Sequence, residues 1–321
     1  MQRPVAIVGA GVSGLTCGVL LAETGRPVEI LAEATGTVIT SGAAAAVWFP
    51  YDAEPAHLVI SWALKTFSVL RQLSAQPESG VSMIEIRHLS RQVEIEIPSW
   101  AVSLGAMRLQ RGLLPQGFVS GYTLVVPLTD TSRYLDYLAT RFRAAGGEIR
   151  TDVHLERLEL VPRKFSIVVN CSGIGAKALV PDHELEPHRG QVVLVPRVDL
   201  PTALVCDDFP LMYVIPRAND CVFGGTNELS GNWDTNPEQS RRILKECSRT
   251  LGIEPPPILA ERVGLRPYRR SGVCLKEDQL GDGRRVIHNY GHGGSGFTLS
   301  WGCAETVQAI AQHRDPNLGL S

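Results

Sequence analysis

The sequence predicts an α/β protein in which a discontinuous domain built on a parallel sheet is combined with a second, mixed-sheet α+β domain. Residues 4–15 read PVAIVGAGVSGL, an apolar strand that runs through a glycine-rich turn into a helix. Helices and strands alternate at both ends of the 321-residue chain, whereas its middle is rich in strands. A parallel-sheet domain assembled from both ends, with segments inserted between them, accounts for these observations.

Composition excludes several classes of protein. Hydrophobic residues make up 44% and charged residues 20%, with a net charge of −2, so neither nucleic acid nor an anionic membrane is expected as a partner. No apolar run reaches the roughly 20 residues of a membrane-spanning helix, and the N-terminus enters a strand without a signal peptide. Seven dispersed cysteines predict buried, reduced thiols, no metal site and a cytoplasmic location.

The first motif predicts a Rossmann-like dinucleotide site. A strand at 5–8 leads into Gly9-x-Gly11-x-x-Gly14, and apolar spacing predicts a helix over 13–24. Gly9 permits the tight turn, Gly11 lets backbone N–H groups approach a pyrophosphate, and Gly14 allows close helix packing. A purely structural glycine turn is the alternative, and the motif alone does not separate FAD from NAD.

An acidic residue completes this βαβ opening. The second strand, at 28–31, is followed by Glu33, close to the position about 20 residues after the first glycine where an acid bonds the ribose.

The remaining elements follow from periodicity. Residues 40–51, TSGAAAAVWFPY, are small and then aromatic, and a tightly packed buried helix is one interpretation of them. Amphipathic spacing predicts helices at 57–77 and 132–145, and alternation predicts a strand over 81–97. The last group of expected elements comprises strands at 167–169, 192–195, 211–215, 221–223, 264–275 and 285–290, and a final helix at 296–312.

Three side chains are candidates for binding a substrate. Arg266, held extended before Pro267, could bind a carboxylate in bidentate fashion, although a surface arginine is the alternative. Tyr213, on an apolar strand, could donate a second hydrogen bond, although a half-buried sheet tyrosine is the more common case. His292, among glycines, more often shapes such a loop than acts as a base. Without a catalytic triad or a paired set of carboxylates, the chemistry is expected to belong to a cofactor.

A series of segments carries a resemblance over nearly the whole chain. GAGVSGL, TSGAAAAVWFPY, VNCSGIGA, PHRGQVVLV, MYVIP, GGTNELSGNW, GLRPYRR and IHNYGHGGSGFTLSWGCA occur in this order. The sequence resembles the D-amino acid oxidase and D-aspartate oxidase family, of bacterial type, and the GLRP and HGGSG motifs are the specific ones.

The resemblance implies noncovalent FAD and a set of site residues. It implies that Arg266 and Tyr213 bind the substrate carboxylate, that the Gly294 carbonyl accepts from the substrate amine, and that Phe49 lines the substrate pocket. The residues it implies for FAD are Gly9, Gly11, Val12, Ser13, Gly14, Glu33, Thr40, Ser41, Ala45, Ala46, Trp48, Val153, Ser172, Gly173, Arg266, Gly293, Gly296, Phe297 and Thr298.

The implied reaction is oxidative deamination of D-amino acids, preferably neutral or basic, by hydride transfer from Cα to flavin N5, with O₂ reduced to hydrogen peroxide. The alternatives are a D-aspartate or D-glutamate oxidase, a glycine or N-alkyl amino acid oxidase, a quinone-linked dehydrogenase, an NAD-dependent dehydrogenase and a non-catalytic dinucleotide-binding protein. Phe49 and Ser295 stand where the family commonly has glutamine and tyrosine, and no second tyrosine precedes Tyr213, which suggests a more open pocket.

The alternation of helices and strands at both ends of the chain, with a strand-rich middle, also predicts how the chain is divided. An FAD-binding domain is expected from residues 1–50, 130–178 and 262–321, and a substrate-binding domain from 51–129 and 179–261. The expected partners are a small D-amino acid and O₂, and a homo-oligomer is left open.

Overall fold

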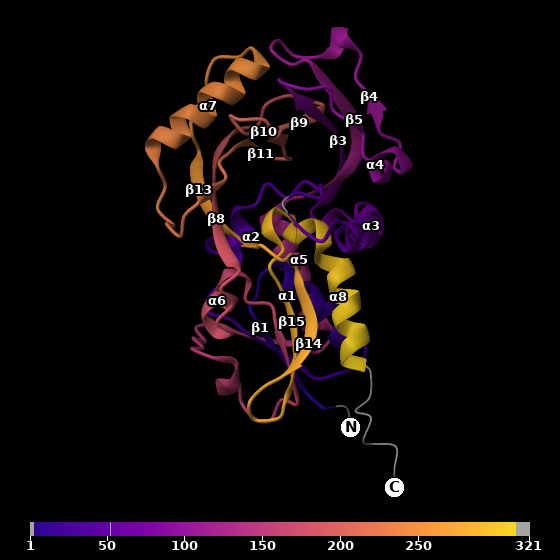
Figure 1. Cartoon of the computed structure of the whole chain (residues 1–321), viewed down its shortest axis with the longest axis vertical. Helices are drawn as coiled ribbons and strands as arrows, with labels where there is room; N and C mark the ends of the chain where they lie inside the picture. Colours follow the sequence, from indigo (N-terminus) through magenta and orange to yellow (C-terminus); the bar gives the residue numbers. More distant parts are fainter. Residues whose placement is uncertain (1–2, 52, 313–321) are drawn as a thin grey trace.

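The computed structural model describes residues 3–51 and 53–312. Two sheets organise this part of the chain. In Figure 1 the first lies in the lower half and the second in the upper half, and the long strands near residues 190 and 265 pass between them.

The first sheet is six-stranded and draws on three separated stretches of sequence. Its order is β14-β15-β7-β1-β2-β6, parallel except for the antiparallel β14–β15 pair. Its strands are β1 (Val5–Val8), β2 (Val28–Leu31), β6 (Glu148–Arg150), β7 (Ile167–Asn170), β14 (Cys274–Gln279) and β15 (Arg285–Tyr290). The central strands are apolar because helices and loops cover both of their faces.

Three helices pack together beside this sheet. They are α1 (Val12–Ala22), α5 (Thr131–Ala144) and α8 (Gly296–Gln312), and α1 contacts the other two. Gly18 brings α1 close to its neighbours, because a β-carbon there would lie 3.0 Å from Ile30 Cδ1 and 3.2 Å from the Phe142 ring. The helix predicted at 296–312 has the bounds observed for α8.

The second sheet is nine-stranded and mixed. Its order is β12-β8-β11-β10-β9-β3-β5-β4, with β13 also pairing with β8. Its strands are β3 (Val81–Ser90), β4 (Met107–Arg108), β5 (Ser120–Thr129), β8 (Leu185–Pro196), β9 (Thr202–Cys206), β10 (Met212–Pro216), β11 (Asp220–Gly224), β12 (Glu228–Leu229) and β13 (Ala260–Arg269). Helix α7 (Pro237–Leu251) packs on β8, β10 and β11, whereas α3 (Ala56–Leu73) packs on α8, β3 and β5.

Short helices complete the described chain. The α-helical ones are α2 (Thr40–Ala43), α4 (Ser99–Ser103) and α6 (Ala176–Leu179), and the 3₁₀ turns are Gly36–Val38, Pro77–Ser79, Arg111–Leu113, Leu158–Leu160, Gly173–Gly175 and Gly293–Ser295.

Several predicted elements were wrong in extent, among them the strand predicted at 192–195, which is part of the longer β8, and the helix predicted at 57–77, which ends at Leu73. The strand predicted at 81–97 ends at Ser90, because Asp208 Oδ2 accepts hydrogen bonds from Ser90 Oγ (2.7 Å) and the Arg91 N–H (2.6 Å) where the chain turns. The strand predicted at 264–275 is two strands, separated by a turn at Gly272 with a φ of +87°. The segment 40–51 is helical only through α2 and extended afterwards.

The predicted domain boundaries stay a prediction, and the sheets bear on one of them. Residues 262–269, predicted to belong with the FAD-binding part, pair with β8 in the nine-stranded sheet through β13. The residues at 1–2 and 313–321 of that predicted domain lie outside the described chain.

Candidate active site

A cavity of about 670 Å³ extends from the carboxyl ends of β1 and β2 to strands β8, β9, β10 and β13 of the second sheet. It therefore joins the predicted nucleotide site to the predicted substrate residues. The predicted residues that line it are Gly9, Gly11, Val12, Ser13, Glu33, Thr40, Ser41, Ala45, Ala46, Phe49, Val153, Ser172, Gly173, Tyr213, Arg266, Gly293, Gly294, Gly296, Phe297 and Thr298. Of the predicted set, Gly14 and Trp48 are absent from its wall.

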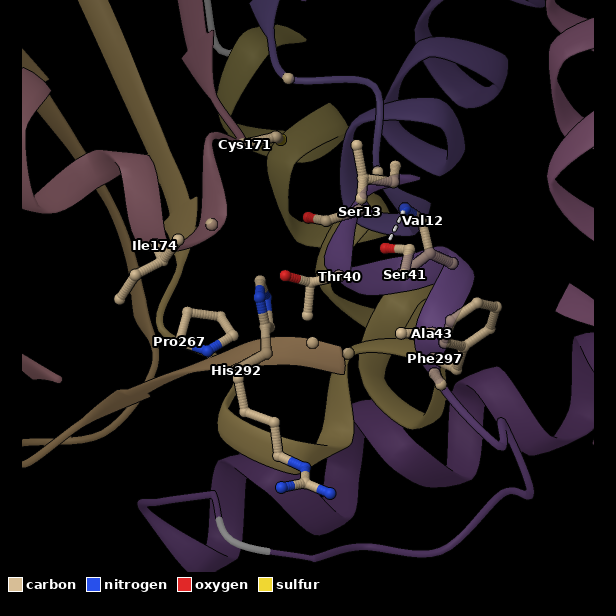
Figure 2. A pocket seen from close by; sticks show the side chains of 18 of the residues that line it. Val12, Ser13, Thr40, Ser41, Ala43, Cys171, Ile174, Pro267, His292 and Phe297 are labelled. Atoms are coloured by element: carbon tan, nitrogen blue, oxygen red, sulfur yellow. Dashed lines mark hydrogen bonds between the residues drawn. The ribbon is translucent and has the colours of Figure 1, made fainter. Parts of the chain in front are cut away.

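The glycine motif builds the first end of the cavity. Gly9 has a φ of +106°, and a β-carbon on it would lie 2.4 Å from the Cys171 carbonyl oxygen. A β-carbon on Gly14 would lie 1.9 Å from the Gly9 oxygen, so Gly14 serves the helix-to-strand contact rather than the cavity wall. The Val12 N–H at the start of α1 donates to Ser41 Oγ at 3.1 Å, the dashed line in Figure 2. This helix N-terminus favours an anionic ligand.

Glu33 stands at the end of β2 with its carboxylate largely exposed. His154 Nδ1 lies 2.5 Å from Glu33 Oε1, and the neighbouring Val153 N–H donates to the Ala32 carbonyl at 3.0 Å. Residues 153 and 154, in the loop that follows β6, are thereby attached to the residues that follow β2. The carboxylate is placed where a ribose hydroxyl could donate to it.

The small-residue segment 40–46 forms one wall of the cavity. Thr40 Oγ1 donates to the Leu265 carbonyl at 3.2 Å, which ties α2 to β13, and Ala46 turns the chain with a φ of +55°. In Figure 2 Thr40, Ser13 and Ser41 lie together, with Ile174 and Pro267 across from them. Small side chains here leave room for a flat ligand.

Trp48, predicted to contact the cofactor, has its side chain in the core and outside the cavity wall. Its side chain is 1% exposed, its ring packs edge-on to Phe67 and Trp100, and its Nε1 donates to the Ala63 carbonyl at 3.0 Å. Neighbouring side chains of an extended segment point to opposite sides, so Phe49 faces the cavity while Trp48 faces the core.

The segment after β7 closes the wall near the glycine motif. Ser172 Oγ donates to Asn170 Oδ1 at 2.6 Å, and Gly173 has a φ of +58°. The start of α8 lies close by, where Thr298 Oγ1 donates to the Phe49 carbonyl at 3.0 Å. The glycine turn before α8 is therefore fixed against the segment that follows α2.

Arg266 and Tyr213 meet at the other end of the cavity. Arg266 Nη1 donates to the Thr226 carbonyl at 2.9 Å, and β-carbons on Gly224 and Gly225 would lie 2.0 Å and 2.7 Å from Tyr213 ring atoms and hydroxyl. Burial raises the pKa of the Tyr213 phenol, while the Arg266 guanidinium, which interacts with it, partly offsets that rise. Tyr213 is thus a neutral donor beside a cation at neutral pH.

Gly294 lies beneath an aromatic ring that sequence reasoning missed. A β-carbon on Gly294 would lie 2.5 Å from Tyr51 Cδ1, and Asn227 Nδ2 donates to the Tyr51 hydroxyl at 3.2 Å. Tyr51 lines the cavity two residues after Phe49, as the period of an extended chain requires. Once the segment is known to be extended, the alternation of its side chains indicates that residues 49 and 51 face the same side.

Two further lining residues, Asp207 and Trp233, were also missed. Asp207 follows β9, and Trp233 lies in the loop after β12. The position of Asp207 depends on how β9 pairs with its neighbours, and that of Trp233 depends on the conformation of a loop. Neither feature has a local sequence signal.

Two polar residues near the cavity are engaged by other protein groups. Ser295 is fully buried and outside the cavity wall; its Oγ donates to the Tyr51 carbonyl at 2.5 Å and accepts from the Tyr51 N–H at 2.8 Å, so it fixes Tyr51 against the glycine turn. Arg217, a basic side chain close to Tyr213 in sequence, is 9% exposed and forms two hydrogen bonds with Asp220 at 2.6 and 2.7 Å, outside the cavity wall.

His292 is buried beside the cavity. Its Nε2 faces Asn289 Oδ1 at 3.0 Å, and burial lowers its pKa to about 4. The ring is therefore neutral over the physiological range, and its contact with Asn289 holds it beside the glycine turn.

No cluster of histidine, cysteine, aspartate or glutamate that could hold a metal occurs among residues 3–51 and 53–312. The same part of the chain contains no helix with the length and apolarity to cross a membrane. All seven cysteines are free and buried, as predicted.

The chain is similar to known flavoproteins over almost its entire length. The sequence profile of a family described as FAD dependent oxidoreductase matches residues 4–310. A D-amino-acid oxidase of Rubrobacter xylanophilus is 41% identical over 315 residues, covering 95% of this chain and 94% of that protein. A D-amino-acid oxidase of Streptomyces coelicolor is 37% identical, covering 96% of each.

A solved structure has the same fold. The glycine oxidase of Bacillus cereus superposes with a TM-score of 0.81 over 98% of this chain and 96% of its own, at 18% identity. At that identity the match bears on the fold alone.

Proposed function

The chain belongs to the FAD-dependent oxidoreductase family, and from this we propose that it oxidises D-amino acids, with water and O₂, to 2-oxo acids, ammonia and hydrogen peroxide. Its relatives favour this activity over the glycine, acidic D-amino acid and NAD-dependent alternatives. The cofactor is FAD.

The cavity fits this cofactor. Gly9 and Gly11 leave backbone N–H groups of the turn and of α1 accessible to a pyrophosphate, and Glu33 offers a carboxylate for the ribose. Small residues at 40–46 and the glycines before α8 leave space for the flavin ring. When bound, the cofactor supplies a hydride acceptor and the route for electrons to O₂.

The substrate residues are assigned by their chemistry. Arg266 binds the α-carboxylate with its planar guanidinium, and the Tyr213 hydroxyl donates a further hydrogen bond to it. The Gly294 carbonyl accepts from the α-amine, while Phe49 and Tyr51 form the wall around the substrate. The carboxylate contact, the amine contact and the pocket wall fix three groups on Cα, so only one enantiomer directs its Cα–H toward the hydride acceptor. Catalysis then comes from this positioning and requires no protein base.

One observation carries this assignment. Arg266 is the only lysine or arginine that lines the cavity within the described residues, and it lies beside Tyr213 on the sheet opposite the nucleotide end. A cation with an adjacent neutral donor is the arrangement that recognises a carboxylate.

An anaerobic spectrum tests the proposal. The visible bands of the oxidised flavin should bleach on addition of D-alanine and stay unchanged with L-alanine. Arg266→Ala should lower kcat/KM for D-alanine about 100-fold or more, because a charge-assisted bidentate contact is lost. Arg270→Ala is the matched control, since Arg270 is exposed and pairs with Glu186 outside the cavity. Bleaching by L-alanine alone, or equal effects of the two variants, would contradict the assignment.

We also propose a cellular location for the protein and a division of its chain into two parts. Seven free, buried cysteines support a cytoplasmic protein. The two sheets support a division into FAD-binding and substrate-binding parts, with β13 moved to the second.

A further inference from the structure

Asp207 is a carboxylate at the substrate end of the cavity. The lining residues with acidic side chains, within the described chain, are Glu33 and Asp207. Glu33 follows β2 at the nucleotide end, whereas Asp207 follows β9 in the sheet that carries Tyr213 and Arg266. The two carboxylates therefore serve different parts of the ligand.

Strand register places Asp207 near the carboxylate-binding residues. Val205 of β9 pairs with Tyr213 of β10, and both line the cavity. Asp207 lies two residues beyond Val205, on the same face of the strand. The Cα atoms of Asp207 and Tyr213 are then separated by roughly 8 Å, one strand spacing across and two residues along.

The Asp207 carboxylate is accessible from the cavity. Its side chain is 35% exposed, and His88 Nε2 lies 3.0 Å from Oδ2. A carboxylate offers several acceptor positions on its two oxygens, so this contact orients the group and leaves acceptor capacity on Oδ1. The negative charge of Asp207 acts on nearby groups: after burial, it is the second cause of the raised pKa of Tyr122.

The wall between the two charges is apolar. Val205 and Leu211 line the cavity next to Asp207, and Phe49 lies on the wall near His88, with ring centroids 5.0 Å apart. An apolar wall that ends in a carboxylate matches a side chain with a methylene stem and a cationic head. An acidic substrate side chain would meet repulsion there, and Arg217, paired with Asp220, does not line the cavity to receive it.

We propose that Asp207 forms a subsite for the cationic side chain of a basic D-amino acid, such as D-arginine or D-lysine. The proposal rests on the proposed function, because it assumes that Arg266 holds the α-carboxylate. The substrate then spans the pocket with its carboxylate at Arg266 and its side-chain cation at Asp207.

Substrate pairs of matched shape test the subsite. D-Citrulline has the shape of D-arginine without the charge, so the ratio of their kcat/KM values isolates the cation. We expect the wild-type holoenzyme to favour D-arginine at least fivefold, which corresponds to about 1 kcal/mol at a partly exposed site. A ratio near one would overturn the subsite without any variant.

Variants locate the effect. Asp207→Asn keeps the shape and should reduce the arginine-to-citrulline ratio at least fivefold. Glu85→Gln is the matched control: it removes one carboxylate from β3 on the face opposite His88, outside the cavity wall, and should leave the ratio unchanged. An unchanged ratio in Asp207→Asn, or an equal loss in both variants, would contradict the role of Asp207.

The two proposals can fail separately. If D-alanine and every other D-amino acid leave the flavin oxidised, the oxidase activity itself is refuted. If D-alanine bleaches the flavin but D-arginine is used no better than D-citrulline, only the Asp207 subsite is refuted.

Discussion

The guanidinium of Arg266 lies against the backbone of Gly190, so that a β-carbon on Gly190 would stand 2.4 Å from Nη1 and 2.5 Å from Cζ. Both residues belong to the paired strands β13 and β8, where Gly190 is opposite Gly264. The absence of a side chain at 190 is therefore what permits Arg266 to lie in the cavity.

Gly190→Ala should displace Arg266 without removing its charge. We expect kcat/KM for D-alanine to fall about tenfold or more, mainly through a higher KM, because the carboxylate contact loses its alignment. Steady-state kinetics would measure this, with retained flavin absorbance as evidence that the nucleotide end is intact. If the folded variant had the kinetics of the wild type, the position of the guanidinium would not matter for binding the carboxylate, and the prediction would be wrong.

The glycines of the first motif should separate into two classes. A β-carbon on Gly11 would meet only Ser41 Oγ, at 3.0 Å, and Gly11 has an ordinary φ of −74°, so Gly11→Ala should fold. Its methyl group would occupy the approach to the pyrophosphate, and we expect the Kd for FAD to rise about tenfold or more. Titration of the apoprotein with FAD, followed by flavin fluorescence, measures this.

Gly14→Ala provides the contrast. The added carbon would meet the backbone oxygen of Gly9 at 1.9 Å, which a side-chain rotation cannot relieve. We expect a loss of about 3 kcal/mol or more of unfolding free energy in the apoprotein. Equal stability of Gly11→Ala and Gly14→Ala would contradict this division of roles.

Sequence patterns predicted the parts of the site that depend on local conformation. Gly9, Gly11 and Glu33 were identifiable because strand, turn and helix follow one another along the chain. The end of α2 at Ala43 had no local signal, so sequence patterns could not tell that the side chain of Phe49 lines the cavity and that of Trp48 does not. Asp207 was missed because the strand before it, β9, was not predicted, and the place of Asp207 at the cavity depends on the pairing of β9 with β10.

Trp48 should matter for stability rather than for binding. Trp48→Phe removes the Nε1 hydrogen bond to the Ala63 carbonyl, which is buried, and part of the ring contact with Phe67 and Trp100. We expect a loss of about 2 kcal/mol, measured by urea unfolding. The Kd for FAD should stay within about twofold of that of the wild type. A large change would indicate that Trp48 contributes to cofactor binding.

His292 should make the protein sensitive to acid. Burial lowers its pKa from 6.5 to about 4, so between these values the unfolded chain binds a proton that the folded chain does not. The unfolding free energy contributed by this group is therefore fully present above pH 6.5 and falls as the pH approaches 4. Over that window the loss amounts to about 3 kcal/mol.

The test compares the pH dependence of stability with and without this ring. His292→Gln should flatten the fall in unfolding free energy between pH 6.5 and 4.5, measured by urea denaturation at several pH values. His57→Gln is the control, because His57 is exposed at the start of α3 and should leave the slope unchanged. If His292 were instead a catalytic base, His292→Gln would abolish flavin reduction by D-alanine at every pH. A positioning role predicts that reduction persists at neutral pH, because the neutral ring holds the Gly293–Gly294 turn through Asn289 without exchanging a proton.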